Sequence, residues 1–377
     1  MTRVIRILHL VSGDLWAGAE VQAYTLIDHL QRRPGVEVGA MVMNPGILAN
    51  KLAALGIRVE VLDETRLNAA EIVLRMLRYI KAWRPDVIHT HRDKENILGS
   101  LANGLGRRAP IIRTQHGGEE HRGAVGWRAV RRRLVAGVDR SVQRVSGQTT
   151  IAVSETLRAD LVERLPNHRV VVIENGVDIE GFRAQVGTAD DRQGNPDVAH
   201  IGIVGRLVPV KRVDLFLEMA ALLHQQYPDR SWAFDVVGDG AERAKLGALC
   251  DRLGIADRVT FHGHRQDIAT CLAGLDVLVM CSDHEGMPMT ALEAAALAVP
   301  TVAHAVGGLT EVVPNEFQVT RHDPVGYRAG VLRALRADAR RITSTHAMRI
   351  LTRFSAERNA ERTLALYRQV MSPEATV

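Results

Sequence analysis

Residues 276–298 read DVLVMCSDHEGMPMTALEAAALA, and this stretch decides the fold. The apolar run at 276–282 fits a buried strand, and a glycine-containing turn follows it. The proline and the apolar residues after that turn predict a helix over 289–298, because proline is tolerated in the first turn of a helix. A buried strand that leads through a tight turn into a helix is the repeating unit of a parallel α/β sheet.

The same alternation of strands and helices runs along most of the chain. The strands predicted in the first half lie at 4–11, 36–43, 58–62, 86–91, 110–116, 149–154 and 170–175, with helices between them such as 20–31, 69–83 and 155–165. In the second half, the predicted strands lie at 200–207, 232–239, 258–263, 276–282 and 300–304, and the helices at 214–226, 241–253, 267–274 and 289–298. Strands alternating with helices imply parallel, doubly wound sheets, so we expect an α/β protein with two Rossmann-like domains in tandem.

A break in this pattern divides the chain. Residues 183–199 lose all periodicity and collect Gly, Pro, Asp and Gln, which is typical of a linker. We therefore expect an amino-terminal domain at 1–182 and a carboxyl-terminal domain at 200–354. A last helix, predicted within 355–377, should pack back on the first domain. Ligands of open α/β sheets bind beyond the carboxyl ends of strands, so we expect the two domains to face a central cleft.

Length and composition limit the classes of protein to consider. The chain has 377 residues, of which 46% are hydrophobic and 24% charged, and this ordinary balance excludes a disordered chain. Three cysteines without a CxxC pair argue against a disulfide framework and a zinc site, and favour a reducing compartment. No apolar run reaches the length of about 18 residues that a membrane span needs. We expect a cytoplasmic protein.

The charge is placed unevenly. Residues 1–183 carry 27 basic and 20 acidic side chains, a balance of +7, and the rest carry 21 and 23, a balance of −2. Seven arginines and one acid, Asp139, lie within residues 122–144 among apolar side chains. This segment predicts either a basic helix on a membrane surface or a domain helix whose apolar stripe faces its own core. Aromatic residues make up only 4%, which argues against a nucleic-acid partner.

Two loops of the second half carry paired charges directly after strands. Glu285 lies in the turn of the opening stretch and Glu293 on the helix that follows, whose first N–H groups offer a phosphate site. Carboxylates accept hydrogen bonds from sugar hydroxyls. Arg206 and Lys211 follow the first strand of this half, where they can clamp a diphosphate. Taken alone, each charge fits an ordinary surface residue, but together they fit a nucleotide sugar.

The motifs that contain these residues resemble those of the retaining glycosyltransferases of family 4, which have the GT-B fold. The pair Glu285 and Glu293 matches the family's EX7E signature, and Arg206 with Lys211 matches its GR-x4-K loop. The resemblance also covers the stretches 152–155, 174–178, 237–242 and 261–263. It therefore spans nearly the whole chain.

The resemblance implies a role for each matching residue of the second half. Glu293 would hold the ribose hydroxyls of the donor nucleotide, and Glu285 would lie nearest to the donor sugar. Gly286 and Met287, which follow Glu285, would also contact the donor.

The diphosphate and the transferred sugar would involve both halves of the chain. Arg206 and Lys211 would clamp the diphosphate and stabilise its charge as it leaves. His116 resembles the histidine that the family places beside the transferred sugar, and the alternative for it is a core or turn histidine. Gly18 resembles part of the family's Gly-Gly loop over the donor phosphates, and Ala17 stands in place of the other glycine.

The function predicted on these grounds is transfer of a sugar, with retention at the anomeric carbon, from a UDP- or GDP-linked donor to a hydroxyl acceptor. The catalytic residues would be Glu285, His116, Arg206 and Lys211, with no cofactor and no metal. The resemblance implies a role in cell-surface polysaccharide, lipopolysaccharide or glycolipid synthesis. A lipid-linked acceptor would suit a basic helix at the inner face of the cytoplasmic membrane. The alternatives are an epimerase or phosphorylase of the same fold and a non-catalytic subunit that binds nucleotide sugars.

Overall fold

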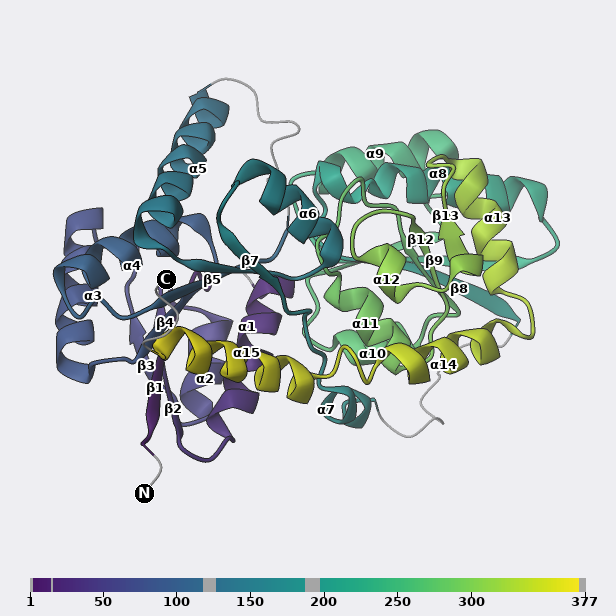
Figure 1. Ribbon diagram of the computed structural model, residues 1–377. Coiled ribbons are helices and arrows are strands. Elements are labelled where there is room, and N and C mark those ends of the chain that lie inside the picture. Colours follow the sequence, from purple (N-terminus) through teal and green to yellow (C-terminus); the bar gives the residue numbers. More distant parts are fainter. Residues whose placement is uncertain (1–2, 15, 118–126, 187–196, 373–377) are drawn as a thin grey trace. The chain divides into compact units, whose positions relative to one another are not determined.

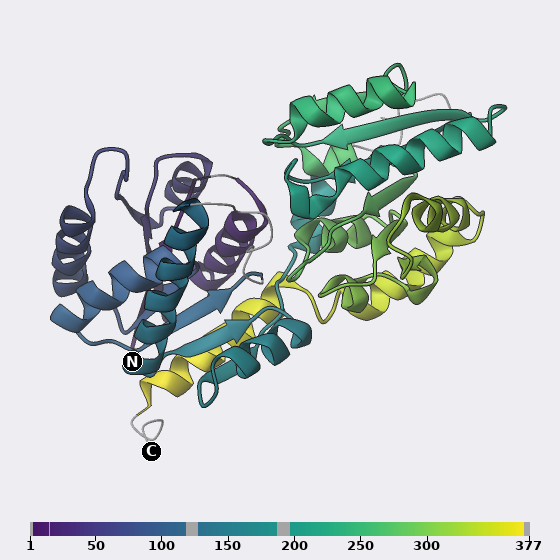
Figure 2. The same cartoon turned by 90° about the horizontal axis from the view of Figure 1, so that it is seen from above.

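The computed structural model describes residues 3–14, 16–117, 127–186 and 197–372. The chain forms two compact units, one of Met1–Gly176 with Ser355–Val377 and the other of Val177–Phe354 (Figures 1 and 2). Both are parallel α/β sheets with helices on their faces, which confirms the predicted fold class.

The first unit is built on a seven-stranded sheet of order β3-β2-β1-β4-β5-β6-β7. Its strands are β1 (Ile5–Val11), β2 (Val36–Val42), β3 (Arg58–Val61), β4 (Val87–Thr90), β5 (Ile111–Gln115), β6 (Thr149–Ala152) and β7 (Arg169–Val172). Its helices are α1 (Gly18–Gln31), α2 (Ile47–Ala54), α3 (Ala69–Trp83), α4 (Asp93–Leu105), α5 (Trp127–Ser146), α6 (Glu155–Arg164) and α15 (Ala356–Met371). Helix α6 is capped by Ser154, whose hydroxyl accepts from the Leu157 N–H at 3.2 Å.

Strand β1 shows why this sheet is buried on both faces. Side chains alternate across a strand, so Ile7 and Val11 pack with α1, α2 and α15, whereas Leu8 and Leu10 pack with α3 and α4. All four side chains are at most 2% exposed. His9 therefore lies on the face that α1, α2 and α15 cover.

Helix α15 completes the core of the first unit although it follows the second unit in the sequence. Its Leu364, Leu366 and Tyr367 belong to the same apolar cluster as α1 and α2. A Cβ at Gly176 would lie 2.6 Å from the Ala356 Cα, so only glycine allows the chain to pass so close to the start of α15. On the other side of the crossing, the Val177 N–H donates to the Phe354 carbonyl at 2.9 Å.

The second unit is built on a six-stranded sheet of order β10-β9-β8-β11-β12-β13. Its strands are β8 (Val198–Val204), β9 (Ser231–Val237), β10 (Val259–Gly263), β11 (Val277–Met280), β12 (Thr301–His304) and β13 (Gln318–Val319). Its α-helices are α7 (Ile179–Ala184), α8 (Val213–Gln226), α9 (Arg243–Leu253), α10 (Ile268–Ala273), α11 (Met289–Ala296), α12 (Leu309–Val312), α13 (Pro324–Ala334) and α14 (Ala339–Ile350). Two short 3-10 helices are η2 (Pro209–Lys211) and η3 (Asn315–Phe317).

The second unit begins at Val177, earlier than the boundary expected at residue 182. The reason is α7, which contacts α11, and the Arg183 Nε donates to the Ala296 carbonyl at 2.7 Å. Part of the linker predicted at 183–199 is thus helix α7 and strand β8, and its residues 187–196 lie outside the described part of the chain.

Candidate active site

The charged loops of the second unit lie at the point where its strand order reverses. Strand β8 has β9 on one side and β11 on the other, and connections run in opposite directions from it. In such sheets, the loops at the carboxyl ends of the two strands diverge and leave a crevice for a ligand. Arg206 and Lys211 follow β8, and Glu285 follows β11, so the topology places both predicted loops at this crevice.

Lys211 and Glu285 are in direct contact. The Lys211 Nζ donates to the Glu285 Oε1 at 2.5 Å, and the Ser282 hydroxyl donates to the same oxygen at 2.6 Å. The two charged side chains are 24% and 10% exposed, so the pair is largely withdrawn from water. Arg206 lines a pocket together with Lys211 and Ser282. The structure thus brings three of the predicted charged residues to one place.

Glycines hold these two loops against their neighbours. A Cβ at Gly238, after β9, would lie 1.9 Å from the carbonyl oxygen of Gly205, which precedes Arg206. A Cβ at Gly307 would come equally close to the Glu285 carbonyl. The Gly308 N–H also donates to the Gly286 carbonyl at 2.9 Å. The loops can therefore pack this closely only with glycine at these positions.

Glu293 lies on α11, which begins at Met289 as the sequence predicts. Pro288 is the N-cap and has extended backbone angles, so the proline precedes the first turn. Glu293 is 8% exposed, and burial raises its pKa to about 7. Met287, between Glu285 and the helix, is 5% exposed. A carboxyl near its titration point in an apolar setting suits a partner that donates hydrogen bonds, such as a diol.

The remaining predicted donor residue, Gly18, is the first residue of α1 in the other unit. The N-cap is Ala17, which offers no side-chain cap, so the first N–H groups of α1 lack the usual hydroxyl or carboxylate partner. Glu20 in the first turn is buried and forms an ion pair with Arg92, which follows β4. The acid lies where the helix dipole favours negative charge.

His116 follows β5 and belongs to a buried group of histidines that sequence reasoning missed. Its Nε2 lies 3.1 Å from the Nδ1 of His91, and the Nε2 of His91 lies 3.1 Å from the Nδ1 of His9. His89, on β4, stacks on His91 with ring centroids 4.5 Å apart. These residues surround the β1/β4 pair, where the strand order of the first unit reverses.

The histidine group was detectable in part from the sequence. His89 and His91 are two residues apart at the end of a strand, so they point to the same face. His9 pairs with His89 in the register of β1 and β4, which the sequence does not specify. Ligand nitrogens of these three histidines lie within 4.8 Å of one another, as in a metal site. However, the two nitrogens of His89 already contact the Tyr367 hydroxyl at 2.5 Å and the Thr114 hydroxyl at 2.7 Å.

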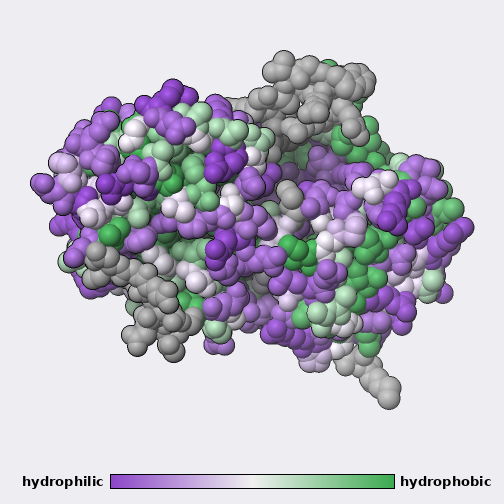
Figure 3. Space-filling view, turned by 180° about the vertical axis from the view of Figure 1, so that it is seen from behind, coloured by the Kyte–Doolittle hydropathy of each residue, from purple (hydrophilic) through white to green (hydrophobic). Residues whose placement is uncertain are grey.

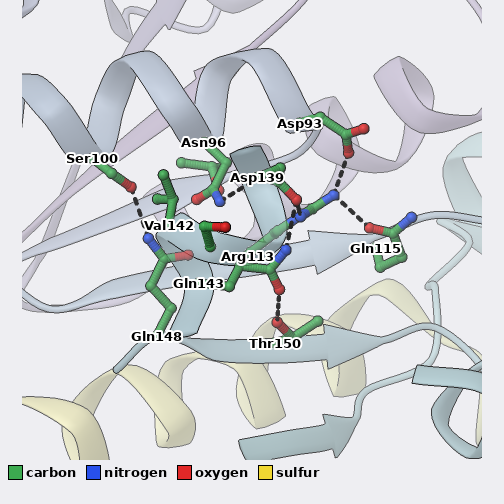
Figure 4. A network of polar contacts seen from close by, with 12 residues as sticks. Asp93, Asn96, Ser100, Arg113, Gln115, Asp139, Val142, Gln143, Gln148 and Thr150 are labelled. Atoms are coloured by element: carbon green, nitrogen blue, oxygen red, sulfur yellow. Dashed lines mark hydrogen bonds and ion pairs between the residues drawn. The ribbon is translucent and has the colours of Figure 1, made fainter. Parts of the chain in front are cut away.

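A second polar network holds α5 against the rest of the first unit (Figure 4). Arg113 on β5 forms an ion pair with Asp139 of α5, and both side chains are 4% exposed. Asn96 and Gln143 donate to the two oxygens of Asp139 at 2.8 and 2.6 Å. Burial raises the pKa of Asp139, against the effect of the Arg113 charge. The single acid of the basic segment is therefore its anchor.

Helix α5 exposes four large apolar side chains, although Ala136 of the same helix is buried. The four residues that we call the α5 stripe are 48%, 62%, 50% and 89% exposed: Val130, Leu134, Val138 and Val145. Their spacing puts them on one side of the helix, opposite Asp139. The interpretation in which the apolar stripe of residues 122–144 faces the core is thus wrong for Val130, Leu134 and Val138. Residues 122–126 of the basic segment lie outside the described part of the chain.

One face of the molecule is mixed in character. Figure 3 shows one face, on which hydrophilic residues surround smaller hydrophobic patches. None of the helices in the described ranges is both long and apolar enough to cross a membrane.

Two family models match the chain, and together they span most of it. Residues 16–180 match glycosyltransferase family 4, and residues 199–337 match the glycosyl transferases of group 1. A D-inositol 3-phosphate glycosyltransferase of Salinispora tropica is 30% identical, over 96% of this chain and 79% of that protein. The chain belongs to glycosyltransferase family 4.

Other glycosyltransferases and solved structures are also similar to this chain. A UDP-Gal:alpha-D-GlcNAc-diphosphoundecaprenol alpha-1,3-galactosyltransferase of Escherichia coli is 27% identical, over 65% of this chain and 64% of that protein. The crystal structure of HepE from Anabaena in complex with UDP and glucose matches with a TM-score of 0.80 at 21% identity, over 97% of this chain and 99% of that one. This likeness, with the two parallel sheets, confirms the two-domain GT-B fold.

The residues singled out in the sequence fall within the two matched segments of this family 4 glycosyltransferase. Gly18 and His116 lie in the first segment, and the paired charges of the second unit lie in the other. The protein is thus a glycosyltransferase, and the charged pocket at the β8/β11 crevice is its candidate active site.

Proposed function

We propose that this glycosyltransferase transfers a sugar from a nucleoside-diphosphate sugar to a hydroxyl group, with retention at the anomeric carbon and without a metal ion or cofactor. The observation that carries the proposal is the contact between Lys211 and Glu285 at the β8/β11 crevice, with Arg206 lining the same pocket. Two cations supplied by the chain can neutralise the leaving diphosphate, which is the charge that a metal ion would otherwise balance.

The roles of the charged residues follow from their surroundings. Lys211 is already held by Glu285, so its ammonium group does not have to reorganise as charge develops on the diphosphate. Glu285 shares one oxygen between Lys211 and Ser282, which leaves its other oxygen for a hydroxyl of the donor sugar. Glu293 holds the ribose, whose hydroxyls donate to the carboxylate and offset its burial.

Each of the other predicted site residues has its own role in the proposal. Gly286 and Met287 contact the donor beside Glu285, and the uncapped first turn at Gly18 receives phosphate. His116 offers a ring nitrogen to the transferred sugar.

UDP is the donor nucleotide that we propose, because the similar HepE structure contains UDP and glucose. Thermal-shift measurements with UDP-, GDP- and ADP-sugars should show stabilisation by UDP-sugars, since a ligand that binds only the folded chain raises its stability. The acceptor product should carry the anomeric configuration of the donor, as read by NMR. An inverted product, or epimerisation of the donor without acceptor, would contradict the proposal.

The acceptor that we propose is lipid-linked and lies at the inner face of the cytoplasmic membrane, in the synthesis of a surface polysaccharide, lipopolysaccharide or glycolipid. The similar Escherichia coli enzyme is named for a lipid-diphosphate acceptor. The support from this chain is the exposed α5 stripe, because all of its residues except Val145 lie within residues 122–144, which carry seven arginines and one acid. An apolar stripe flanked by arginines fits a bilayer surface that contains anionic lipid.

Vesicle flotation tests the membrane contact. The wild type should float with anionic vesicles and not with neutral ones, and Leu134→Ser with Val138→Ser should abolish flotation without loss of stability, because both side chains are exposed. Leu101→Ser is the matched control, since Leu101 on α4 is 53% exposed in the same unit. Equal flotation of the wild type and the stripe variant would contradict the proposal. So would a wild type that does not float but forms a dimer in solution that the stripe variant cannot form.

A further inference from the structure

Three of the buried histidines form a hydrogen-bonded chain that ends at the candidate active-site histidine. His91 stands in the middle, with its Nε2 on His9 and its Nδ1 on His116, each at 3.1 Å. The rings are nearly parallel, with interplanar angles of 26° and 15°. Both nitrogens of His91 are thus engaged, one as a donor and the other as an acceptor.

These imidazoles are neutral. Burial lowers the pKa of His9 and of His116 to about 3, and that of His91 well below its usual value. A neutral imidazole carries one proton, so each ring that donates through one nitrogen must accept through the other. The direction of donation is therefore the same along the whole chain, and the tautomer of His116 depends on that of His9.

The two ends of the chain differ. The His9 Nε2 and the His116 Nδ1 are both buried without a hydrogen-bond partner among the described residues. His9 is 0% exposed in the middle of the sheet, whereas His116 follows the carboxyl end of β5 and is only partly buried. The His116 end therefore lies near the surface, although its Nδ1 is itself closed to solvent, and no polar group of the described residues bonds to the His9 end.

The direction of donation follows from this difference. If His116 donated toward His9, the last N–H would be the His9 Nε2–H, a buried donor without an acceptor, which costs about 1–3 kcal/mol. If His9 donates toward His116, the free N–H is the His116 Nδ1–H, and a bound hydroxyl can accept it. The second arrangement leaves only a lone pair at the buried end.

We propose that His9 and His91 are positioning residues, which order the protons of this chain so that His116 presents its Nδ1–H to a hydroxyl oxygen of the transferred sugar. The proposal rests on the proposed function, because that function places the sugar at His116. The three hydrogen-bonded histidines thus offer an uncharged N–H donor in a fixed position. Binding of the sugar gives this His116 Nδ1–H its acceptor. Metal chelation is not needed to explain the group, since His89 uses both nitrogens on Tyr367 and Thr114.

Histidine NMR tests the proton order without any assumption about activity. With ¹⁵N-labelled histidine, the wild type should show His116 protonated at Nδ1 and unprotonated at Nε2, the His116→Asn variant serving to assign its signals. His91→Phe should remove the preference, because the ring that accepts from His9 and donates to His116 is lost. Protonation of His116 at Nε2 in the wild type would overturn the proposal even if the enzyme is an active transferase.

Kinetics tests the consequence for transfer. His91→Phe should lower kcat by roughly 10- to 100-fold with little change in the KM of the donor. His91→Gln should recover part of the loss, since an amide can accept and donate at once. His89→Phe is the matched control. Like His91, His89 is buried, and its ring stacks on that of His91, but it is not part of the hydrogen-bonded row of His9, His91 and His116. It should keep kcat within about twofold of the wild type.

The outcomes separate the two proposals. If His91→Phe and His89→Phe lower kcat alike, the histidines serve only packing, and the positioning role is wrong. If the wild type transfers no sugar from any donor but His116 has the expected tautomer, the proposed function fails and the proton order stands. His91→Gln keeps the test valid if His91→Phe does not fold.

Discussion

Glu285 and Glu293 both carry carboxyl groups that are largely buried, but the surroundings of the two groups differ. Glu285 receives an ammonium and a hydroxyl proton from Lys211 and Ser282, so its charge is matched within the protein. Burial of Glu293 raises its pKa to about 7. One carboxylate is thus prepared before the ligand binds, and the other is stabilised as an anion only when a donor of hydrogen bonds arrives.

The stability of the protein should depend on pH through Glu293. The unfolded carboxyl titrates near 4.5 and the folded one near 7, so between these values the folded chain holds an extra proton. The free energy of unfolding therefore falls as the pH rises through this window. Glu293→Gln should reduce that fall, as measured by urea unfolding at about pH 5 and about pH 8, and should also weaken donor binding.

The control for this prediction is Glu163→Gln, the same substitution at an exposed position of α6. It should leave the difference in stability between the two pH values unchanged. A Glu293→Gln variant with the same pH dependence as the wild type would show that Glu293 does not titrate in this range.

Lys211→Ala should lower kcat by about 10²–10³-fold, the usual effect of removing one group that stabilises developing negative charge. Steady-state kinetics with the donor found in the binding screen measures this. Lys245→Ala is the control, because Lys245 also forms an ion pair in the second unit, with Glu242, but is 72% exposed. A Lys211→Ala variant that retains the wild-type kcat would refute the diphosphate clamp.

How far the sequence predicted these residues depended on their position along the chain. Glu285, Arg206 and Lys211 were found because each directly follows a predicted strand, and the carboxyl ends of parallel strands share one edge. The contact of His9 with His91 was not predictable in this way. It depends on β1 pairing with β4 across the sheet, and that neighbour relation is set by packing of the whole unit.

Helix α5 reverses the usual arrangement of an amphipathic helix, with Asp139 and Gln143 inside and the α5 stripe outside. Periodicity in the sequence predicted a helix with two faces but could not decide which face is buried, because both alternatives have the same spacing. Arg113 on β5 determines which face is buried, because this buried cation requires a carboxylate partner and Asp139 of α5 supplies it. A polar anchor thus frees the apolar side for another surface.

Asp139→Asn should destabilise the protein by about 3–5 kcal/mol, because it leaves the buried charge of Arg113 without its main partner. Chemical denaturation measures the change. Asp93 also forms an ion pair with Arg113 but is 41% exposed, so Asp93→Asn should cost at most about 1 kcal/mol. Similar losses in both variants would show that the Arg113–Asp139 pair does not anchor α5.

On the scale of the whole molecule, the alternation of strands and helices predicted two parallel sheets, and the structure has them. The order of the strands was not predictable from one sequence, since it arises from competition among many similar apolar strands. No strand or helix was predicted within residues 305–354, yet they include the short strand β13 and the helices α13 and α14. Short edge strands carry too few residues for a period-two signal.

The two units should differ in their ability to fold alone. Residues 177–354 contain all elements of the second unit, so this fragment should fold cooperatively and bind the donor nucleotide. Residues 1–176 lack α15, whose Tyr367 is 0% exposed in the core, and should not fold. A fragment in which residue 176 is joined to 355–377 by a short linker should regain folding, because Gly176 lies beside Ala356. Circular dichroism and thermal unfolding measure all three.

The late position of α15 also has a consequence for synthesis of the protein on the ribosome. The amino-terminal unit emerges first, but the helix that closes its core is translated only after the entire second unit. At a translation rate of roughly 5–20 residues per second, this delay amounts to roughly 10–40 s. During this time the nascent chain exposes the apolar surface that Leu364 and Leu366 later cover. The second unit must therefore fold as an insertion within an unfinished neighbour, and newly made chains are most open to aggregation in that interval.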